Sequence, residues 1–168
     1  GRFLTETRPY GSDDFGQVGA QAALVVDKRN RPRGTTRGAV LAVAGAMYPK
    51  AWDVEENFGE AHGEMSGFLT FGPTLALRVG GKQVWGRYPY HEAAFIGGPD
   101  TVRGLRRERF AGDASAFGNA ELRLRLFDFK VLVPIDFGVF GLADAGRVFM
   151  DGEESDTWHH GVGGGVSF

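Results

Sequence analysis

Apolar and polar residues alternate along much of the chain, most clearly between residues 116 and 127. The even positions of this segment are all small or aliphatic, whereas the odd positions include Asn119, Glu121, Arg123 and Phe127. A period of two sorts residues in this way only when the backbone is extended, because successive side chains of a strand point to opposite faces. The segment is therefore predicted to be a β-strand with one apolar and one mainly polar face.

The same alternation predicts six further strands. They cover residues 18–27, 38–48, 62–71, 75–82, 131–145 and 158–168. The second of these is apolar on both faces, and the last has one face made almost entirely of glycine. Most are close to the length of about 9–11 residues with which a tilted strand crosses a bilayer. No segment shows a convincing helical period, so an all-β fold is expected.

Short and long connections alternate between the predicted strands. The short ones are residues 72–74 and 127–130, together with a moderate turn at 29–36. The long polar ones are residues 49–59, 85–115 and 147–157. Bacterial outer-membrane barrels show this asymmetry, with short periplasmic turns and longer extracellular loops. We therefore predict an antiparallel up-and-down transmembrane β-barrel segment over residues 1–168, with residues 1–16 outside the cell and Phe168 on the periplasmic side.

The composition agrees with β structure and narrows the chemistry. The 168 residues include 27 glycines and 14 phenylalanines, and glycine is costly in helices while aromatic residues favour strands. The chain has no cysteine, which excludes disulfides and thiolate metal sites. Its net charge is -2, so the chain lacks the excess of basic residues that is typical of a nucleic-acid-binding domain. No apolar stretch reaches the roughly 20 residues of a transmembrane helix.

Several short motifs follow one another in a characteristic order. They are Asp-Lys-Arg-Asn at 27–30 with Gly38, Phe-Ile-Gly-Gly-Pro-Asp-Thr-Val-Arg-Gly-Leu at 95–105, Gly-Asn-Ala-Glu-Leu-Arg at 118–123, the segment 140–149 and the glycine-rich segment 158–166. Together they resemble the C-terminal barrel of the BamA/TamA superfamily, also called bacterial surface antigen domains. The resemblance covers nearly the whole chain. It implies about seven strands of a larger barrel of about 16 strands, located in the bacterial outer membrane, that takes part in protein insertion or translocation.

The resemblance also implies a loop clamp. In this family a Val-Arg-Gly tip belongs to a long extracellular loop that folds back into the lumen, and its arginine pairs with acids on the inner wall. Carried over, the loop covers about residues 85–115, Arg103 is its arginine, and Glu121 and Asp144 are the partners. Both acids also fall on the polar faces of their predicted strands. The tip and the residues flanking it are Gly97, Gly98, Val102, Gly104, Phe140 and Gly146.

Elementary chemistry supports such a clamp. A guanidinium offers a planar fork of donors that carboxylates accept in pairs, and glycines supply the φ freedom of a tight tip. Phe140 shares a face with Asp144 and is expected to flank the arginine. Leu105 stands where the family usually has an aromatic residue, so ring stacking is not expected there.

No constellation of catalytic or metal-binding residues is evident. His159 and His160 are adjacent, so in a strand they point to opposite faces, and His62 with Glu64 makes only two ligands. The glycine run at 161–165 does not precede a helix, as a dinucleotide-binding loop would. We therefore expect neither an enzyme, nor a cofactor, nor a bound metal.

The expected partners follow from the predicted sheet. Seven strands is an odd number, and an open sheet leaves two unpaired edges that lipid does not tolerate. We therefore expect missing strands, a partner chain or self-pairing at the edges. The resemblance adds outer-membrane lipid, unfolded client proteins and accessory assembly subunits, with no nucleic acid. Two alternatives stay open: a barrel that anchors or exports a fused patatin-like lipase or phosphoesterase domain, and a soluble β-sandwich binding module.

Overall fold

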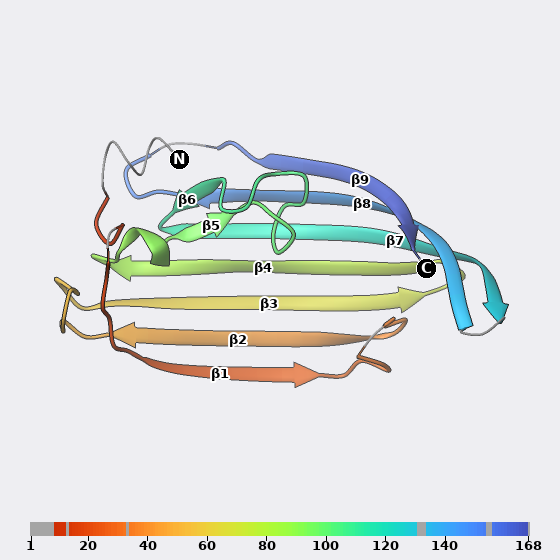
Figure 1. The fold of residues 1–168 in the computed structure, drawn as a ribbon, viewed down its shortest axis with the longest axis horizontal. Coiled ribbons are helices and arrows are strands. Elements are labelled where there is room, and N and C mark those ends of the chain that lie inside the picture. Colours follow the sequence, from red (N-terminus) through yellow and green to blue (C-terminus); the bar gives the residue numbers. More distant parts are fainter. Residues whose placement is uncertain (1–8, 13, 33, 131–133, 154–155, 168) are drawn as a thin grey trace.

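The chain forms one long antiparallel sheet with a small hairpin over one of its faces (Figure 1). The computed structural model describes residues 9–12, 14–32, 34–130, 134–153 and 156–167. The strands are β1 (Ala20–Asp27), β2 (Gly38–Tyr48), β3 (Phe58–Thr70), β4 (Thr74–Gly86), β5 (Ala94–Ile96), β6 (Phe110–Gly112), β7 (Ala114–Lys130), β8 (Pro134–Phe149) and β9 (His159–Ser167). A 3-10 helix, η1, covers Tyr90–Glu92.

The predicted all-β antiparallel class is confirmed. The main sheet has seven strands in the order β1-β2-β3-β4-β7-β8-β9, and β5 pairs with β6 as a separate hairpin. In the described part of the chain, β1 pairs only with β2 and β9 pairs only with β8, so the sheet is not closed into a barrel. No helix in these residues is long and apolar enough to cross a membrane.

Several predicted strand boundaries need correction. β8 ends at Phe149 and not at residue 145. β3 begins at Phe58 and β4 ends at Gly86, so both extend farther toward the long connections than predicted. Residues 127–130, predicted as a connection, belong to β7. The loop predicted at 85–115 shrinks to residues 87–113 and contains η1, β5 and β6, which are too short to show a period in the sequence. Parts of the predicted topology concern residues that the structure does not describe, namely 1–8, 131–133 and Phe168.

A β-bulge explains why the end of β7 was predicted as a connection. The register between β7 and β8 shifts between Arg125 and Phe127, so Leu126 is an extra residue in this strand. The alternation of faces changes phase at such a bulge. Leu126 and Phe127 are both exposed, and the Phe127 ring stacks on Phe137 of β8 with centroids 4.9 Å apart. A strict period of two had placed Phe127 on the polar face, and that prediction was wrong.

The two faces of the main sheet differ in chemistry. The apolar face carries exposed aliphatic side chains on all seven strands, among them Leu24, Leu41, Val43, Met65, Leu77, Val79, Leu122, Leu124, Val139, Val162 and Val166. The polar face carries Glu60, His62, Glu64, Arg78, Lys82, Asn119, Glu121, Arg123 and Asp144. Val162 on β9 is 85% exposed. In the described part of the chain no second sheet covers the apolar face, as a sandwich would require.

The buried core lies at one end of the polar face. Its centre is Val54, Phe58, Val84 and Ala94, against which Phe15, Tyr48 and Tyr88 pack. The connections at 49–57, 87–113 and 150–158 meet at this end, here called the loop end (Figure 1). The turns at 28–37 and 71–73 lie at the opposite end, here called the turn end (Figure 1). The connections at 71–73 and 87–113 have the predicted short and long lengths. The turn at 28–37 has ten residues, however, and the connections at 49–57 and 150–158 have nine each, so the predicted regular alternation of short and long connections is wrong.

Candidate functional site

The connection between β4 and β7 folds over the polar face instead of extending away from the sheet (Figure 1). Its strand β5 contacts β4, β7 and β8, and β6 contacts β8. We call residues 87–113 the folded loop and residues 97–105 its tip. The tip therefore lies above the strands that carry Glu121 and Asp144.

The three predicted tip glycines have the conformations that were expected of them. Gly97, Gly98 and Gly104 have φ values of 117°, 94° and 91°, a region that side chains rarely tolerate. The Gly97 N–H donates to the Thr101 hydroxyl at 2.8 Å, and the Thr101 N–H donates to the Gly98 carbonyl at 3.3 Å. These two bonds close the tip on itself.

Arg103 contacts both predicted acids. Its Nε and Nη2 atoms donate to Asp144 Oδ2 and Oδ1 at 2.9 and 2.8 Å, and its Nη1 atom donates to Glu121 Oε2. The Arg103 backbone N–H also donates to Asp144 Oδ2, at 2.8 Å. The predicted contact is confirmed, and one carboxylate fixes both the side chain and the backbone of the tip. We call Arg103, Glu121 and Asp144 the Arg103 clamp.

Burial makes the Arg103 clamp sensitive to the loss of one partner. The Asp144 side chain is 0% exposed, whereas that of Arg103 is 27% exposed. An ionised carboxylate that is buried without its cation costs several kcal/mol, so Asp144 depends on Arg103. The hydrogen bond from Arg103 to Asp144 raises the pKa of Arg103 further above its ordinary value. The arginine therefore stays charged, and the pair does not dissociate through titration of the cation.

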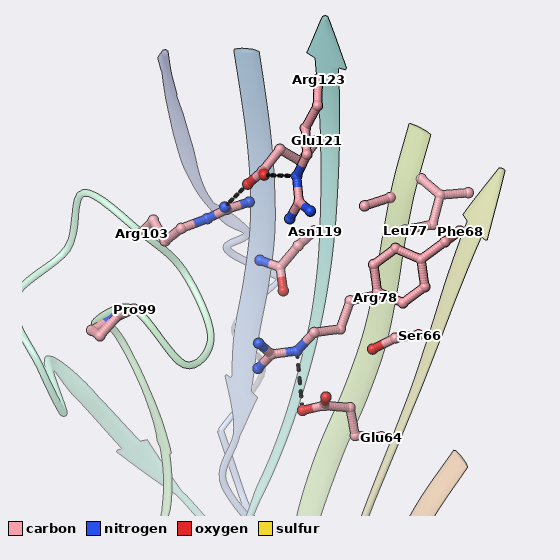
Figure 2. Close-up of a pocket in the computed structure, with 11 residues that line it drawn as sticks. Glu64, Ser66, Phe68, Leu77, Arg78, Pro99, Arg103, Asn119, Glu121 and Arg123 are labelled. Carbon is pink, nitrogen blue, oxygen red and sulfur yellow. Dashed lines mark hydrogen bonds and ion pairs between the residues drawn. The ribbon is translucent and has the colours of Figure 1, made fainter. Parts of the chain in front are cut away.

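The sheet also holds the tip through its own donors, a feature that the sequence did not predict. Arg78 of β4 donates through Nη2 to the Asp100 carbonyl, and Asn119 of β7 donates to the Thr101 carbonyl at 2.6 Å. Arg78 is itself placed by Glu64, whose Oε2 lies 3.0 Å from Arg78 Nε (Figure 2). The polar alternation marks Arg78 and Asn119 as facing the loop, but their targets are backbone carbonyls, which have no signature in a sequence.

Glu121 joins the Arg103 clamp to a second arginine. Its Oε1 accepts a hydrogen bond from Arg123 Nε at 2.6 Å, while its Oε2 accepts the one from Arg103 (Figure 2). A polar cavity of about 270 Å³ separates the tip from β3, β4 and β7 beside these side chains. Charged groups from the loop and the sheet therefore meet across a space large enough for several water molecules.

Two glycines let the tip approach β8 and β9 closely. A Cβ atom at Gly146 would lie 2.7 Å from Val102 Cγ2, and one at Gly161 would lie 2.1 Å from the Arg103 carbonyl oxygen. Val102 itself is fully buried. Gly146 thus contacts the tip as predicted, whereas Gly161 had been given no role. Gly161 is the cross-strand partner of Asp144 in the pairing of β8 with β9. This pairing would have identified Gly161, but the register of the two strands could not be predicted from the sequence.

Phe140 lies on the polar face of β8, four residues before Asp144. Its ring covers Gly165 of β9, where a Cβ atom would lie 2.9 Å from Phe140 Cζ. The predicted flanking of Arg103 by this ring stays a prediction. His62 and Glu64 share the polar face, as the alternation indicated.

The remaining histidine pair, His159 and His160, lies at the start of β9. His159 stacks on Phe110 with centroids 3.7 Å apart, and His160 follows it on the opposite face of β9. In the described ranges, no group of three or more potential ligands is placed to hold a metal ion. The site is therefore a set of ion pairs and hydrogen bonds that positions a loop.

No family model matches the chain, and no curated protein matches it. The support for a function therefore comes from the arrangement of its own side chains, above all the folded loop and the two unlike faces of the sheet.

We predict that Arg103→Ala releases the tip from the sheet. Leaving Asp144 without its cation should cost about 3 kcal/mol, the lower end for buried pairs because Arg103 is partly exposed, and this raises the open fraction of the loop roughly 100-fold. Trypsin reports the opening, because Arg106, Arg107 and Arg109 follow the tip directly. Arg87→Ala, which removes an exposed ion pair with Glu55, is the control. A cleavage rate within two-fold of the unmodified protein would contradict the role of Arg103.

A second prediction tests the close approach of the tip to β9 without changing any charge. Gly161→Ala places a methyl group against the Arg103 carbonyl, so it should raise tryptic cleavage of the tip by at least about five-fold, as overpacking typically costs 1–3 kcal/mol. Gly163→Ala, two residues along the same face, meets only Leu142 at 3.5 Å and should leave cleavage unchanged. Equal cleavage of the two variants would show that the tip does not rest on Gly161.

Proposed function

We propose that the chain is part of the wall of a bacterial outer-membrane β-barrel of the BamA/TamA type, which takes part in the insertion or translocation of proteins. The observation that carries the proposal is a sheet with an exposed apolar face on one side and a charged face, covered by a clamped loop, on the other. Such a sheet suits a boundary between hydrocarbon and a hydrated interior.

The apolar face supports contact with lipid. Soluble monomers rarely expose a continuous apolar patch larger than a few hundred Å², yet aliphatic side chains here stand exposed on every strand of the main sheet. At the loop end of the same face, Trp85 and Trp158 are also exposed. Indole rings favour the interface between hydrocarbon and headgroups, so their position fits the edge of a bilayer.

The polar face supports a hydrated interior. Its charges are paired with one another: Lys82 of β4 contacts Glu60 of β3 and lies 3.7 Å from Glu92 of η1. Arg78 pairs with Glu64 in the same way. One face of the sheet therefore carries several charges. Contact of this face with lipid would be costly, whereas an aqueous lumen accepts charged side chains.

The folded loop and the open edges support a role in moving protein segments. The folded loop occupies the polar side of the sheet. Its base, with Ala94, packs into the apolar core, whereas its tip is tied to the sheet by the polar contacts of Arg103, Arg78 and Asn119, so release of the tip would open that space. β1 and β9 each present one unpaired edge in the described part of the chain. An unpaired edge offers main-chain donors and acceptors to an incoming strand.

Single-cysteine labelling tests the membrane-spanning part of the proposal, because the chain has no cysteine of its own. Leu77→Cys and Leu124→Cys place a bimane on the apolar face, while Ser66→Cys and Ala44→Cys place it on the polar face of neighbouring strands. In phospholipid vesicles, the first pair should be quenched by spin-labelled lipid and the second by aqueous iodide. Indistinguishable quenching of the two pairs would remove the basis for a membrane wall.

Client insertion tests the remaining part. Vesicles that contain the chain are expected to speed the folding of an unfolded outer-membrane barrel protein by several-fold relative to vesicles that contain a small closed barrel, because only the former offer free strand edges. The measurement is the rate at which the heat-modifiable folded band of the client appears. Equal rates would contradict a role in client insertion. If lipid also quenches the apolar face, the result would favour the alternative of a barrel that anchors or exports a fused domain.

A further inference from the structure

The turn between β1 and β2 concentrates positive charge at the turn end. Residues 27–38 contain five basic residues and one acidic residue, although the chain as a whole has a net charge of -2. The other described turn at this end, residues 71–73, is uncharged. At the loop end, residues 49–57, 87–113 and 150–157 together contain eleven acidic and six basic residues, and the excess of acids lies in the first and last of these segments. Charge is therefore separated along the strand direction.

The basic turn is a defined structure built around Asn30. The Asn30 side-chain oxygen accepts hydrogen bonds from the N–H groups of Thr36 and Arg37, each at 3.2 Å, and its Nδ2 donates to the Thr36 hydroxyl at 2.7 Å. The Thr70 hydroxyl of β3 donates to the Thr36 carbonyl at 2.7 Å. The hydrogen bonds that fix the backbone thus do not use the side chains of Lys28, Arg31 and Arg37, which are exposed.

Most of these cations are available to a partner. Arg29 is held by Asp27, with Nη2 and Oδ2 2.6 Å apart. Lys28, Arg31 and Arg37 are exposed, and within the described ranges none of the three forms an ion pair. The turn therefore presents three cations that the fold does not use.

The three cations lie directly beyond the edge of the apolar face. Val26 and Leu41 are cross-strand partners on that face, one position before the turn on β1 and three positions after it on β2, and both are exposed. Phe71, in the neighbouring turn at the same end, is 63% exposed. Apolar side chains followed by cations match the order of acyl chains and phosphate groups in a phospholipid leaflet.

We infer that Lys28, Arg31 and Arg37 bind the phosphate groups of anionic phospholipids in the leaflet that meets the turn end. This inference rests on the proposed membrane-spanning function and adds a lipid preference to it. An acidic protein segment would satisfy the same charges, but it would not explain why the basic turn continues the apolar face. The acidic segments of the loop end should repel the same lipids, so the preference is confined to one leaflet.

A reporter at each end of the apolar face tests this inference. Phe71→Cys labelled with bimane reports on lipid at the turn end, and Met47→Cys, also exposed, reports on the loop end. The protein is placed in phosphatidylcholine vesicles that contain either brominated phosphatidylglycerol or brominated phosphatidylcholine. Each cation near an anionic surface contributes about five-fold, so we expect at least about a ten-fold preference for phosphatidylglycerol at Phe71 and none at Met47.

Matched variants assign the preference to the turn. The triple variant Lys28→Gln, Arg31→Gln, Arg37→Gln should bring the preference at Phe71 to within two-fold of unity. The triple variant Lys50→Gln, Arg106→Gln, Arg107→Gln removes the same charge elsewhere and should keep it. In the unmodified turn, raising the ionic strength should weaken the preference, because exposed charges are screened within about 10 Å at 0.1 M salt.

The outcomes separate this inference from the proposed function. Equal quenching by both lipids at Phe71, or an equal loss of preference in both triple variants, overturns the lipid preference alone. Displacement of the anionic lipid by inorganic phosphate at constant ionic strength also overturns it, since the site would then bind free phosphate. A Phe71 reporter that neither brominated lipid quenches overturns the membrane-spanning function, and the inference with it.

Discussion

A carboxylate that cannot reach water fixes the position of the folded loop. Asp144 is fully shielded, and the Arg103 side chain and backbone together supply three of its hydrogen bonds. Its charge is therefore stable only while the tip is in place, which couples the sheet to the loop more tightly than contact area alone would. The missing side chains of Gly146 and Gly161 make the approach possible, and Arg78 and Asn119 complete it from the other side.

The same sheet separates side chains of different chemistry along two directions. Across its thickness, alternation puts aliphatic side chains on one face and paired charges on the other. Along its strands, acidic connections gather at the loop end and a basic turn lies at the turn end. The proposed role as a barrel wall requires only the first separation. The second has no role in holding the sheet together, and this is why it is better explained by what surrounds each end.

Sequence reasoning found the features that depend on local pattern. Alternation identified the seven main strands and the face of Glu121, and the resemblance singled out Arg103 and its two acids. Alternation failed as a guide at Leu126, where one extra residue changes which face the following side chains occupy. It also failed for β5 and β6, which are too short to show a pattern. Sequence reasoning also missed Gly161 and the targets of Arg78, because both depend on backbone atoms brought close by the register of strands far apart in sequence.

The bulge at Leu126 has a mechanical consequence for β7 and β8. Pairing of β7 with β4 ends at Arg123, and pairing of β8 with β9 ends at Gly138, yet the two strands continue together past the bulge. Beyond this point they form a two-stranded ribbon with no further strand on either side in the described residues. Two-stranded ribbons twist more strongly than wide sheets. The twist of this ribbon is therefore not constrained by β4 or β9, the strands that flank β7 and β8 where they carry Glu121 and Asp144 beneath the folded loop.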